Sequence, residues 1–169
     1  MFLLQSDGRS DAGFDAYRNY VADNADRFPA GALFLARTDW YYGPHDHRGP
    51  HDGRLEAMTV TERSGSGEPH WHNRLVSVEL TLRGAYDDGN ITLRYPTVHS
   101  YNLDGFIVGG GHADWRYDEL RLDEAGHLVH EVEWCFMQDT ARWLIVADDI
   151  QMRWQPDGGL PEMVTPATT

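Results

Sequence analysis

Histidine and arginine residues form the most suggestive chemical pattern in this sequence. His70 and His72 are separated by one residue, so on a β-strand both imidazoles project to the same side, and Arg74 follows with the same spacing. An imidazole can bind a metal or transfer a proton near neutral pH, and a guanidinium can hold a carboxylate or a carbonyl oxygen. This stretch therefore predicts a site for acid–base or metal chemistry.

The following strand is expected to add to this site. With a turn at residues 85–88, Val78 faces Tyr95, Arg74 faces His99 and His72 faces Tyr101, all on the apolar side of the hairpin. We expect a polar cluster at one end of an apolar cavity, made of His70, His72, Arg74, His99 and Tyr101. Pro96 removes a ladder donor and can bulge the strand, and a one-residue slip would reverse the faces beyond it.

A second candidate pair lies near the end of the chain. His130 interrupts an apolar row that contains Trp134, and Asp148 interrupts the apolar row of the next strand. A turn at residues 138–140 would place His130 opposite Asp148, where the carboxylate would fix the tautomer of the imidazole and raise its basicity. Asp118, on the preceding strand, is the competing partner.

The elements that must position these residues are mostly strands. An amphipathic helix is predicted over about residues 10–25, and the period-two patterns after it predict eight strands. These strands are expected at about 32–42, 54–63, 69–83, 90–101, 104–109, 113–122, 127–137 and 142–154. Short turns favour sequential antiparallel neighbours, so we expect a mainly β domain over residues 1–155, an eight-stranded up-and-down barrel, with a loose tail at 156–169.

In strand count and connectivity this pattern resembles the calycin or lipocalin-like barrels. The resemblance implies a closed barrel around a cavity for one small apolar or aromatic molecule. The parity of the strands then predicts the substrate-binding wall: Val76, Val78, Tyr95, Trp134 and His70.

Residues 69–102 also carry a partial likeness to another family. The run Pro69-His70-Trp71-His72, followed by Glu79, Gly84, Pro96 and His99, is similar to the paired motifs of cupins. That similarity implies an alternative in which His70, His72 and His99 hold a divalent metal.

Composition excludes several classes of function. The 169 residues carry a net charge of −13, from 27 acidic and 14 basic residues, which opposes binding to nucleic acid or to an anionic membrane surface. The basic residues are all arginine, so lysine Schiff-base and P-loop chemistry are excluded, and Cys135 is the only cysteine. No apolar run is long enough to span a membrane and no secretory start is present, so we expect a cytoplasmic protein.

A histidine-rich stretch lies between the first two predicted strands. His45, His47 and His51 fall within residues 43–53, which we interpret as a solvated hairpin loop; a lid over the barrel mouth or an adventitious metal site are the alternatives.

These features favour a small-molecule enzyme that needs no cofactor. We expect acid–base catalysis on an apolar or aromatic metabolite, of the cyclase, isomerase, dehydratase or decarboxylase type, in secondary metabolism. Arg74, His72, His99, Tyr101, His130 and Asp148 are the expected catalytic residues. The alternatives are the metal-dependent cupin-like enzyme and a non-catalytic carrier of a hydrophobic ligand or haem. A homodimer is compatible with all three functions.

Overall fold

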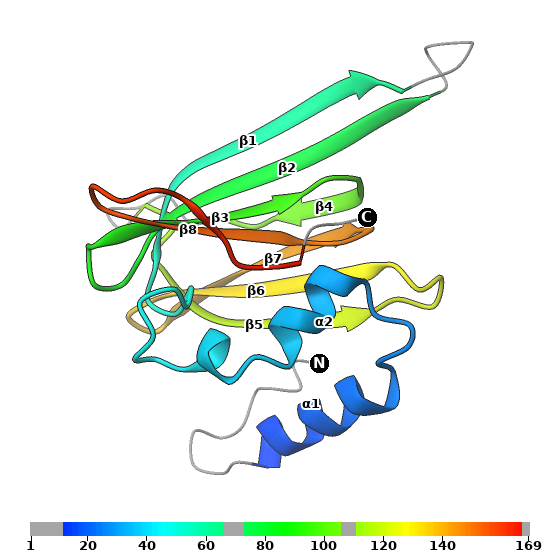
Figure 1. The fold of residues 1–169 in the computed structure, drawn as a ribbon, viewed down its shortest axis with the longest axis horizontal. Helices are drawn as coiled ribbons and strands as arrows, with labels where there is room; N and C mark the ends of the chain where they lie inside the picture. Colours follow the sequence, from blue (N-terminus) through cyan, green and yellow to red (C-terminus); the bar gives the residue numbers. More distant parts are fainter. Residues whose placement is uncertain (1–11, 66–72, 106–110, 167–169) are drawn as a thin grey trace.

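A computed structural model describes residues 12–65, 73–105 and 111–166 of the chain. They form one curved antiparallel sheet, with two helices and a short 3₁₀ helix on one side (Figure 1). The helical elements are α1 (Ala12–Asp23), α2 (Ala30–Ala36) and η1 (Asp39–Tyr42). The strands are β1 (Arg54–Ser64), β2 (Arg74–Arg83), β3 (Gly89–Tyr95), β4 (Val98–Leu103), β5 (Asp114–Leu122), β6 (Leu128–Phe136), β7 (Asp139–Ala147), β8 (Gln151–Pro156) and β9 (Glu162–Met163).

The sheet is open rather than closed. Its strand order is β4-β7-β6-β5-β1-β2-β3-β8-β9, and the end strands β4 and β9 are not paired with each other. The mainly β, antiparallel prediction and the N-terminal helix are confirmed, whereas the closed barrel of eight sequential strands is wrong. Residues 32–42 form α2 and η1 instead of a strand, and the predicted strands 90–101 and 142–154 are each divided in two.

The interruption between β3 and β4 lies next to the interruption between β7 and β8, and the sheet bends there. β3 ends just before Pro96 and β4 begins at Val98, while β7 and β8 are separated by residues 148–150. The N–H of Asp148 donates to the carbonyl oxygen of Thr97 at 2.9 Å, so the ladder continues through the bend. The segments β3–β4 and β7–β8 therefore act as two long paired strands. They join one half of the sheet (β4, β7, β6 and β5) to the other half (β1, β2, β3, β8 and β9) and give the open sheet a barrel-like curvature.

The register of the β2–β3 hairpin agrees with the prediction up to this bend. Val78 pairs with Tyr95, Leu80 with Leu93 and Leu82 with Ile91, and these side chains are buried. Pairing then ends because β4 leaves β2 and joins β7. The predicted pairing of Arg74 with His99 is therefore wrong.

Tyrosines of α1 complete the outer edge of β5. The N–H of Leu120 donates to the Tyr17 hydroxyl at 3.2 Å, and that hydroxyl donates to the Leu120 carbonyl at 3.0 Å. The N–H of Leu122 donates to the hydroxyl of Tyr20 at 2.8 Å. The helix thus satisfies backbone groups that a neighbouring strand would otherwise pair.

Helix α2 is fixed by the bend between β7 and β8. The buried carboxylate of Asp149 accepts the N–H groups of Gly31 and Ala32 at 3.1 and 3.0 Å. A Cβ on Gly31 would lie 2.0 Å from the carbonyl oxygen of Ile150, so only glycine permits this approach. The apolar run of α2 is short, which explains why its sequence also fits a strand.

The C-terminal residues are docked up to Thr165. β9 pairs with β8, and the N–H of Met152 donates to the buried Thr165 hydroxyl at 3.0 Å. Asp157 receives two hydrogen bonds from Arg83, at 2.7 and 2.5 Å. The segment expected to be a loose tail thus extends the sheet.

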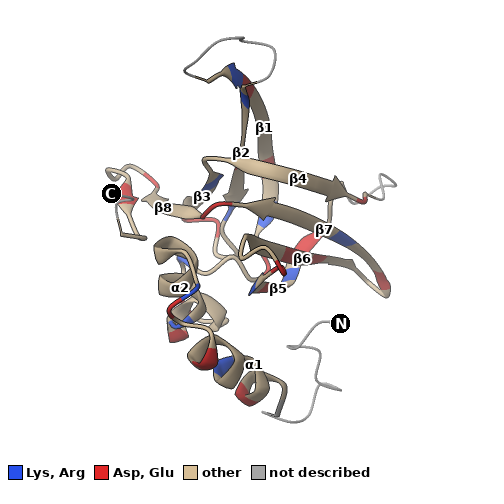
Figure 2. Cartoon of the chain, turned by 90° about the vertical axis from the view of Figure 1, so that its right-hand side faces the viewer, with Lys and Arg blue, Asp and Glu red and all other residues tan. Residues whose placement is uncertain are grey.

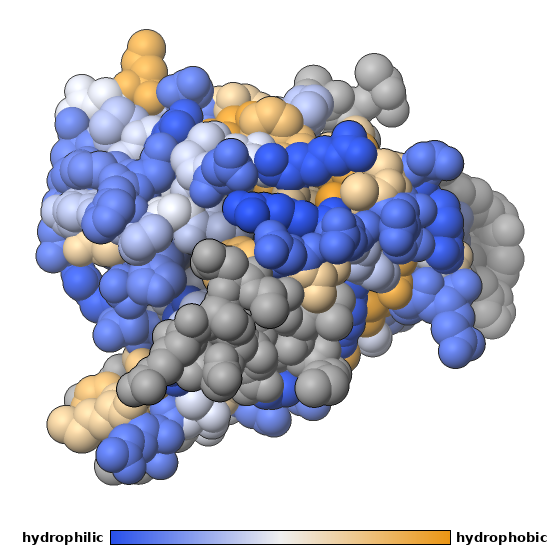
Figure 3. Space-filling model, turned by 90° about the horizontal axis from the view of Figure 1, so that it is seen from below, coloured by the Kyte–Doolittle hydropathy of each residue, from blue (hydrophilic) through white to orange (hydrophobic). Residues whose placement is uncertain are grey.

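Basic and acidic side chains are mixed on the surface of the molecule (Figure 2). Basic and acidic segments lie next to one another on β5–β7 (Figure 2), where Arg121 and Arg142 both bond to Glu131. In the view from below, hydrophilic residues make up most of the coloured surface (Figure 3). None of the described helices is long and apolar enough to cross a membrane.

Candidate functional site

A chain of buried polar side chains crosses the interior of the sheet. The Tyr95 hydroxyl lies 2.6 Å from Nδ1 of His130, and Nε2 of His130 lies 3.0 Å from Oδ2 of Asp118. The Tyr41 hydroxyl donates to Oδ2 of Asp118 at 2.9 Å, and the Trp115 indole N–H donates to Oδ1 at 3.1 Å. Each of these residues is at most 4% exposed.

One tautomer of His130 satisfies the hydrogen bonds on both sides of the ring. If Nδ1 accepts the hydrogen bond from the Tyr95 hydroxyl, the proton on Nε2 is donated to Asp118. Every donor of the chain then has an acceptor. The predicted partner Asp148 is wrong, because the register places Ile145 opposite His130; Asp118, the alternative, is the partner.

The surroundings keep the phenols of this region protonated. Burial raises the pKa of Tyr95 well above its usual value, and the charge of Asp118 raises it further. Burial also raises the pKa of Tyr41, again with a contribution from Asp118. These groups therefore act as hydrogen-bond donors, not as phenolates, at neutral pH.

A pocket of about 190 Å³ lies beside this chain, at the outer edge of β5. We call it the edge pocket. Its lining is mostly aromatic, with one histidine, one arginine and one aspartate: Phe14, Tyr41, Tyr42, Pro44, His51, Trp115, Arg116, Tyr117 and Asp118. The buried chain therefore ends at a pocket wall, through Asp118.

His51 is the base best placed to act in the edge pocket. Its Nδ1 lies 3.1 Å from Oδ2 of Asp52, which leaves Nε2 for another partner. Asp52 has φ = 58°, and its N–H donates to the Trp115 carbonyl at 2.7 Å. The Trp115 N–H donates to the Gly53 carbonyl at 2.9 Å, so the segment is fixed to β5.

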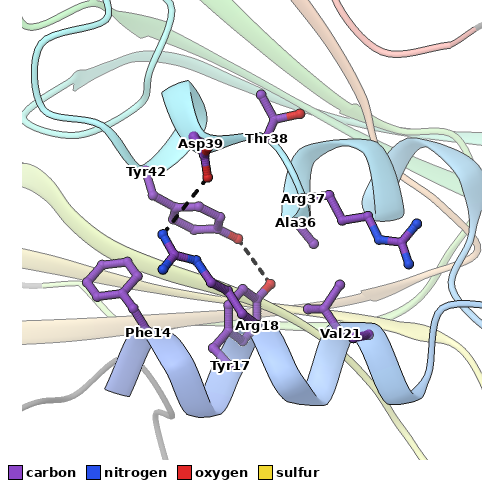
Figure 4. Close-up of a pocket in the computed structure, with 10 residues that line it drawn as sticks. Phe14, Tyr17, Arg18, Val21, Ala36, Arg37, Thr38, Asp39 and Tyr42 are labelled. Atoms are coloured by element: carbon purple, nitrogen blue, oxygen red, sulfur yellow. Dashed lines mark hydrogen bonds and ion pairs between the residues drawn. The ribbon is translucent and has the colours of Figure 1, made fainter. Parts of the chain in front are cut away.

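A second pocket adjoins the first and is shown in Figure 4. It measures about 360 Å³, lies between α1 and the α2–η1 segment, and shares Phe14 and Tyr42 with the edge pocket. The ring of Tyr42 points from η1 toward α1, and its hydroxyl lies 3.0 Å from that of Tyr17. Arg18 reaches from α1 to Asp39, 3.9 Å away.

The predicted polar cluster is not assembled by the described residues. Arg74 is exposed and forms an ion pair with Glu62 at 2.6 Å. His99 forms an ion pair with Asp148, also at 2.6 Å, in an exposed position, and Tyr101 is 46% exposed. The bend at Pro96 is the physical reason, since it turns β4 away from β2.

Of the predicted wall residues, those that the structure describes pack in or against the core and do not line either of the two pockets described above. Val78 and Tyr95 are fully packed, and Val76 is partly buried. Trp134 packs between Trp115 and Trp143, with ring centroids 5.3 and 4.9 Å apart. The interior of the sheet is thus filled by side chains at these positions.

The metal prediction depends on residues that the structure does not describe. His70 and His72 lie outside the described residues. Within residues 12–65, 73–105 and 111–166, no group of three or more His, Cys, Asp or Glu side chains could hold a metal ion.

Sequence reasoning missed the residues that form the edge pocket. The sequence predicts a solvated loop for His51 and a strand for Tyr41, whereas Tyr41 lies in η1. The aromatic run Trp40-Tyr41-Tyr42 so near three histidines was the available signal. Comparison with known proteins finds no family model, no curated protein and no solved structure that matches this chain.

Proposed function

We propose that the chain is a cofactor-independent acid–base enzyme that acts on a small aromatic molecule in the edge pocket. One observation carries the proposal: an imidazole whose Nδ1 lies 3.1 Å from a carboxylate, an arginine and the buried hydrogen-bonded chain meet at one aromatic-walled pocket. Aromatic walls favour a flat apolar ligand, since stacked and edge-on ring contacts add to the burial of apolar area.

The residues suggest a division of roles. His51 would remove a proton from a substrate carbon next to a carbonyl, because Asp52 stabilises the imidazolium that forms. Arg116 would hold the oxygen on which negative charge develops. The imidazolium then returns the proton at a second carbon, so the substrate is isomerised and no other reactant is consumed.

Asp118, His130 and Tyr95 are positioning residues in this scheme. Their hydrogen bonds hold the β5 wall of the pocket in one arrangement, and preorganised walls reduce the cost of orienting the substrate. The proposed setting remains cytoplasmic secondary metabolism, with a small aromatic or apolar molecule as the partner. A calycin-like origin of the curved sheet is part of the same proposal.

Proton exchange tests this function without knowledge of the natural substrate. Aromatic ketones incubated with the protein in D₂O should gain deuterium next to the carbonyl, as measured by NMR of the small molecule. His51→Gln should lower the exchange rate by about 10²-fold or more, with little change in substrate binding.

His45→Gln is the matched control, because His45 belongs to the same histidine-rich segment but does not line the edge pocket. Its exchange rate should stay at that of the unmodified chain. Equal rates for the His51 variant and the unmodified chain would contradict the proposed base.

A non-catalytic carrier is the second candidate. It is favoured by the complete hydrogen bonding of the buried chain, in which no donor is left for a substrate. Tight binding of aromatic molecules without any proton exchange would support this candidate.

A further inference from the structure

The alternation of backbone groups along β5 determines which of them face outward, toward the edge pocket. In an antiparallel strand, alternate residues direct both their N–H and C=O to the same side. Leu120 directs both groups outward, to the hydroxyl of Tyr17. The register of β5 with β6 is unbroken from Tyr117 to Leu122, so the N–H and C=O of Asp118 point outward as well.

Both neighbours of this position along the edge are paired, whereas the outward backbone groups of Asp118 have no partner in the part of the chain that the structure describes. On one side, Leu120 is bonded to Tyr17 of α1. On the other, Trp115 is bonded to Asp52 and Gly53. Among the described residues, none outside the β5–β6 ladder bonds to the backbone N–H or C=O of Asp118.

These two groups are also shielded from solvent. Asp118 is only 4% exposed, and it lines the edge pocket. Buried backbone N–H and C=O groups are paired in more than roughly nine cases in ten, because leaving them unpaired costs free energy. A molecule in the edge pocket therefore gains by supplying one acceptor and one donor at this point.

We propose that the edge pocket selects a planar nitrogen heterocycle with a donor and an acceptor on adjacent ring positions, such as a lactam. This inference rests on the proposed function and names its substrate class. The lactam C=O would accept from the N–H of Asp118, and the lactam N–H would donate to the Asp118 C=O. The aromatic side chains of the pocket would stack against the ring.

Three probes of similar shape test the proposal: 2-quinolone, N-methyl-2-quinolone and naphthalene. Amide NMR shifts of the full chain report binding, and the Leu120 amide, which Tyr17 already pairs, is the internal control. We expect 2-quinolone to shift the Asp118 amide strongly and to bind at least about tenfold more tightly than the other two, as one lost hydrogen bond implies.

The outcomes separate this inference from the proposed function. Equal affinity for 2-quinolone and its N-methyl form would overturn recognition by the Asp118 backbone, while an aromatic-binding pocket would stand. Proton exchange on ketones without any binding of 2-quinolone would also overturn it. His45→Gln should leave 2-quinolone affinity unchanged, because His45 does not line the edge pocket; a large loss in this variant would count against the assigned contact.

Discussion

At the scale of single residues, His130 is the side chain on which most of the buried polar chemistry depends. Its Nδ1 is hydrogen-bonded to the Tyr95 hydroxyl and its Nε2 to Asp118, and it is fully buried. Asp118 is also bonded to Tyr41 and Trp115, so His130 links these residues to Tyr95. The chain Tyr95–His130–Asp118 therefore contributes to stability as well as to the shape of the pocket wall.

Replacing this imidazole should destabilise the fold. His130→Phe keeps the ring volume but leaves the Tyr95 hydroxyl without an acceptor and removes one donor from Asp118. We expect a loss of about 1–3 kcal/mol in the free energy of unfolding, measured by denaturant titration. His99→Phe is the control: its hydrogen bond to Asp148 is exposed, so its loss should cost less than about 1 kcal/mol. Equal losses in the two variants would refute the role assigned to burial.

At the scale of elements, Asp149 anchors the start of α2, and η1, which follows α2 directly, supplies Tyr41 and Tyr42 to the edge pocket. Asp149→Ala should release the buried N–H groups of Gly31 and Ala32. We expect a loss of about 0.5–2 kcal/mol, the usual cost of losing a helix cap, together with weaker binding of aromatic probes. Asp148→Ala, one residue earlier and exposed, should leave probe binding unchanged; weakened binding there as well would show that the cap is not the cause.

Elements were predictable from the sequence where one local pattern determined them. The parity of β2 and β3 fixed the pairs Leu80–Leu93 and Leu82–Ile91, because a slip of one residue would expose an apolar face. Beyond Pro96 the backbone bends, and parity no longer transfers from one strand to the next. Asp118 could be named as a partner of His130, but the choice between it and Asp148 depended on register.

The edge pocket could not be predicted, because its wall comes from three distant segments. Phe14 lies on α1, His51 follows η1 and Tyr117 lies on β5. Only tertiary packing brings these segments together, and no sequence period relates them.

At the scale of the whole molecule, buried phenols make the fold sensitive to alkali. Burial raises the pKa of Tyr17, Tyr41, Tyr42 and Tyr95 above their usual value. A phenol with a raised folded pKa stabilises the native state fully below about pH 10, the unfolded value, and this contribution is lost as the pH rises beyond it.

Ultraviolet titration should therefore show these four tyrosines ionising together, in the pH range where circular dichroism reports unfolding. Ionisation of all tyrosines near pH 10 in a chain that remains folded would contradict the burial of this group.

The bend at Pro96 and Asp148 has a consequence for how the molecule comes apart. Each half of the sheet contains part of the two continuous segments β3–β4 and β7–β8, which are joined at the bend by the hydrogen bond from the N–H of Asp148 to the carbonyl oxygen of Thr97. We expect the two halves to unfold together, because unfolding of one half would also remove strand pairing from the other. The described sheet should therefore unfold as one cooperative unit, without a stable intermediate in which only one half is folded.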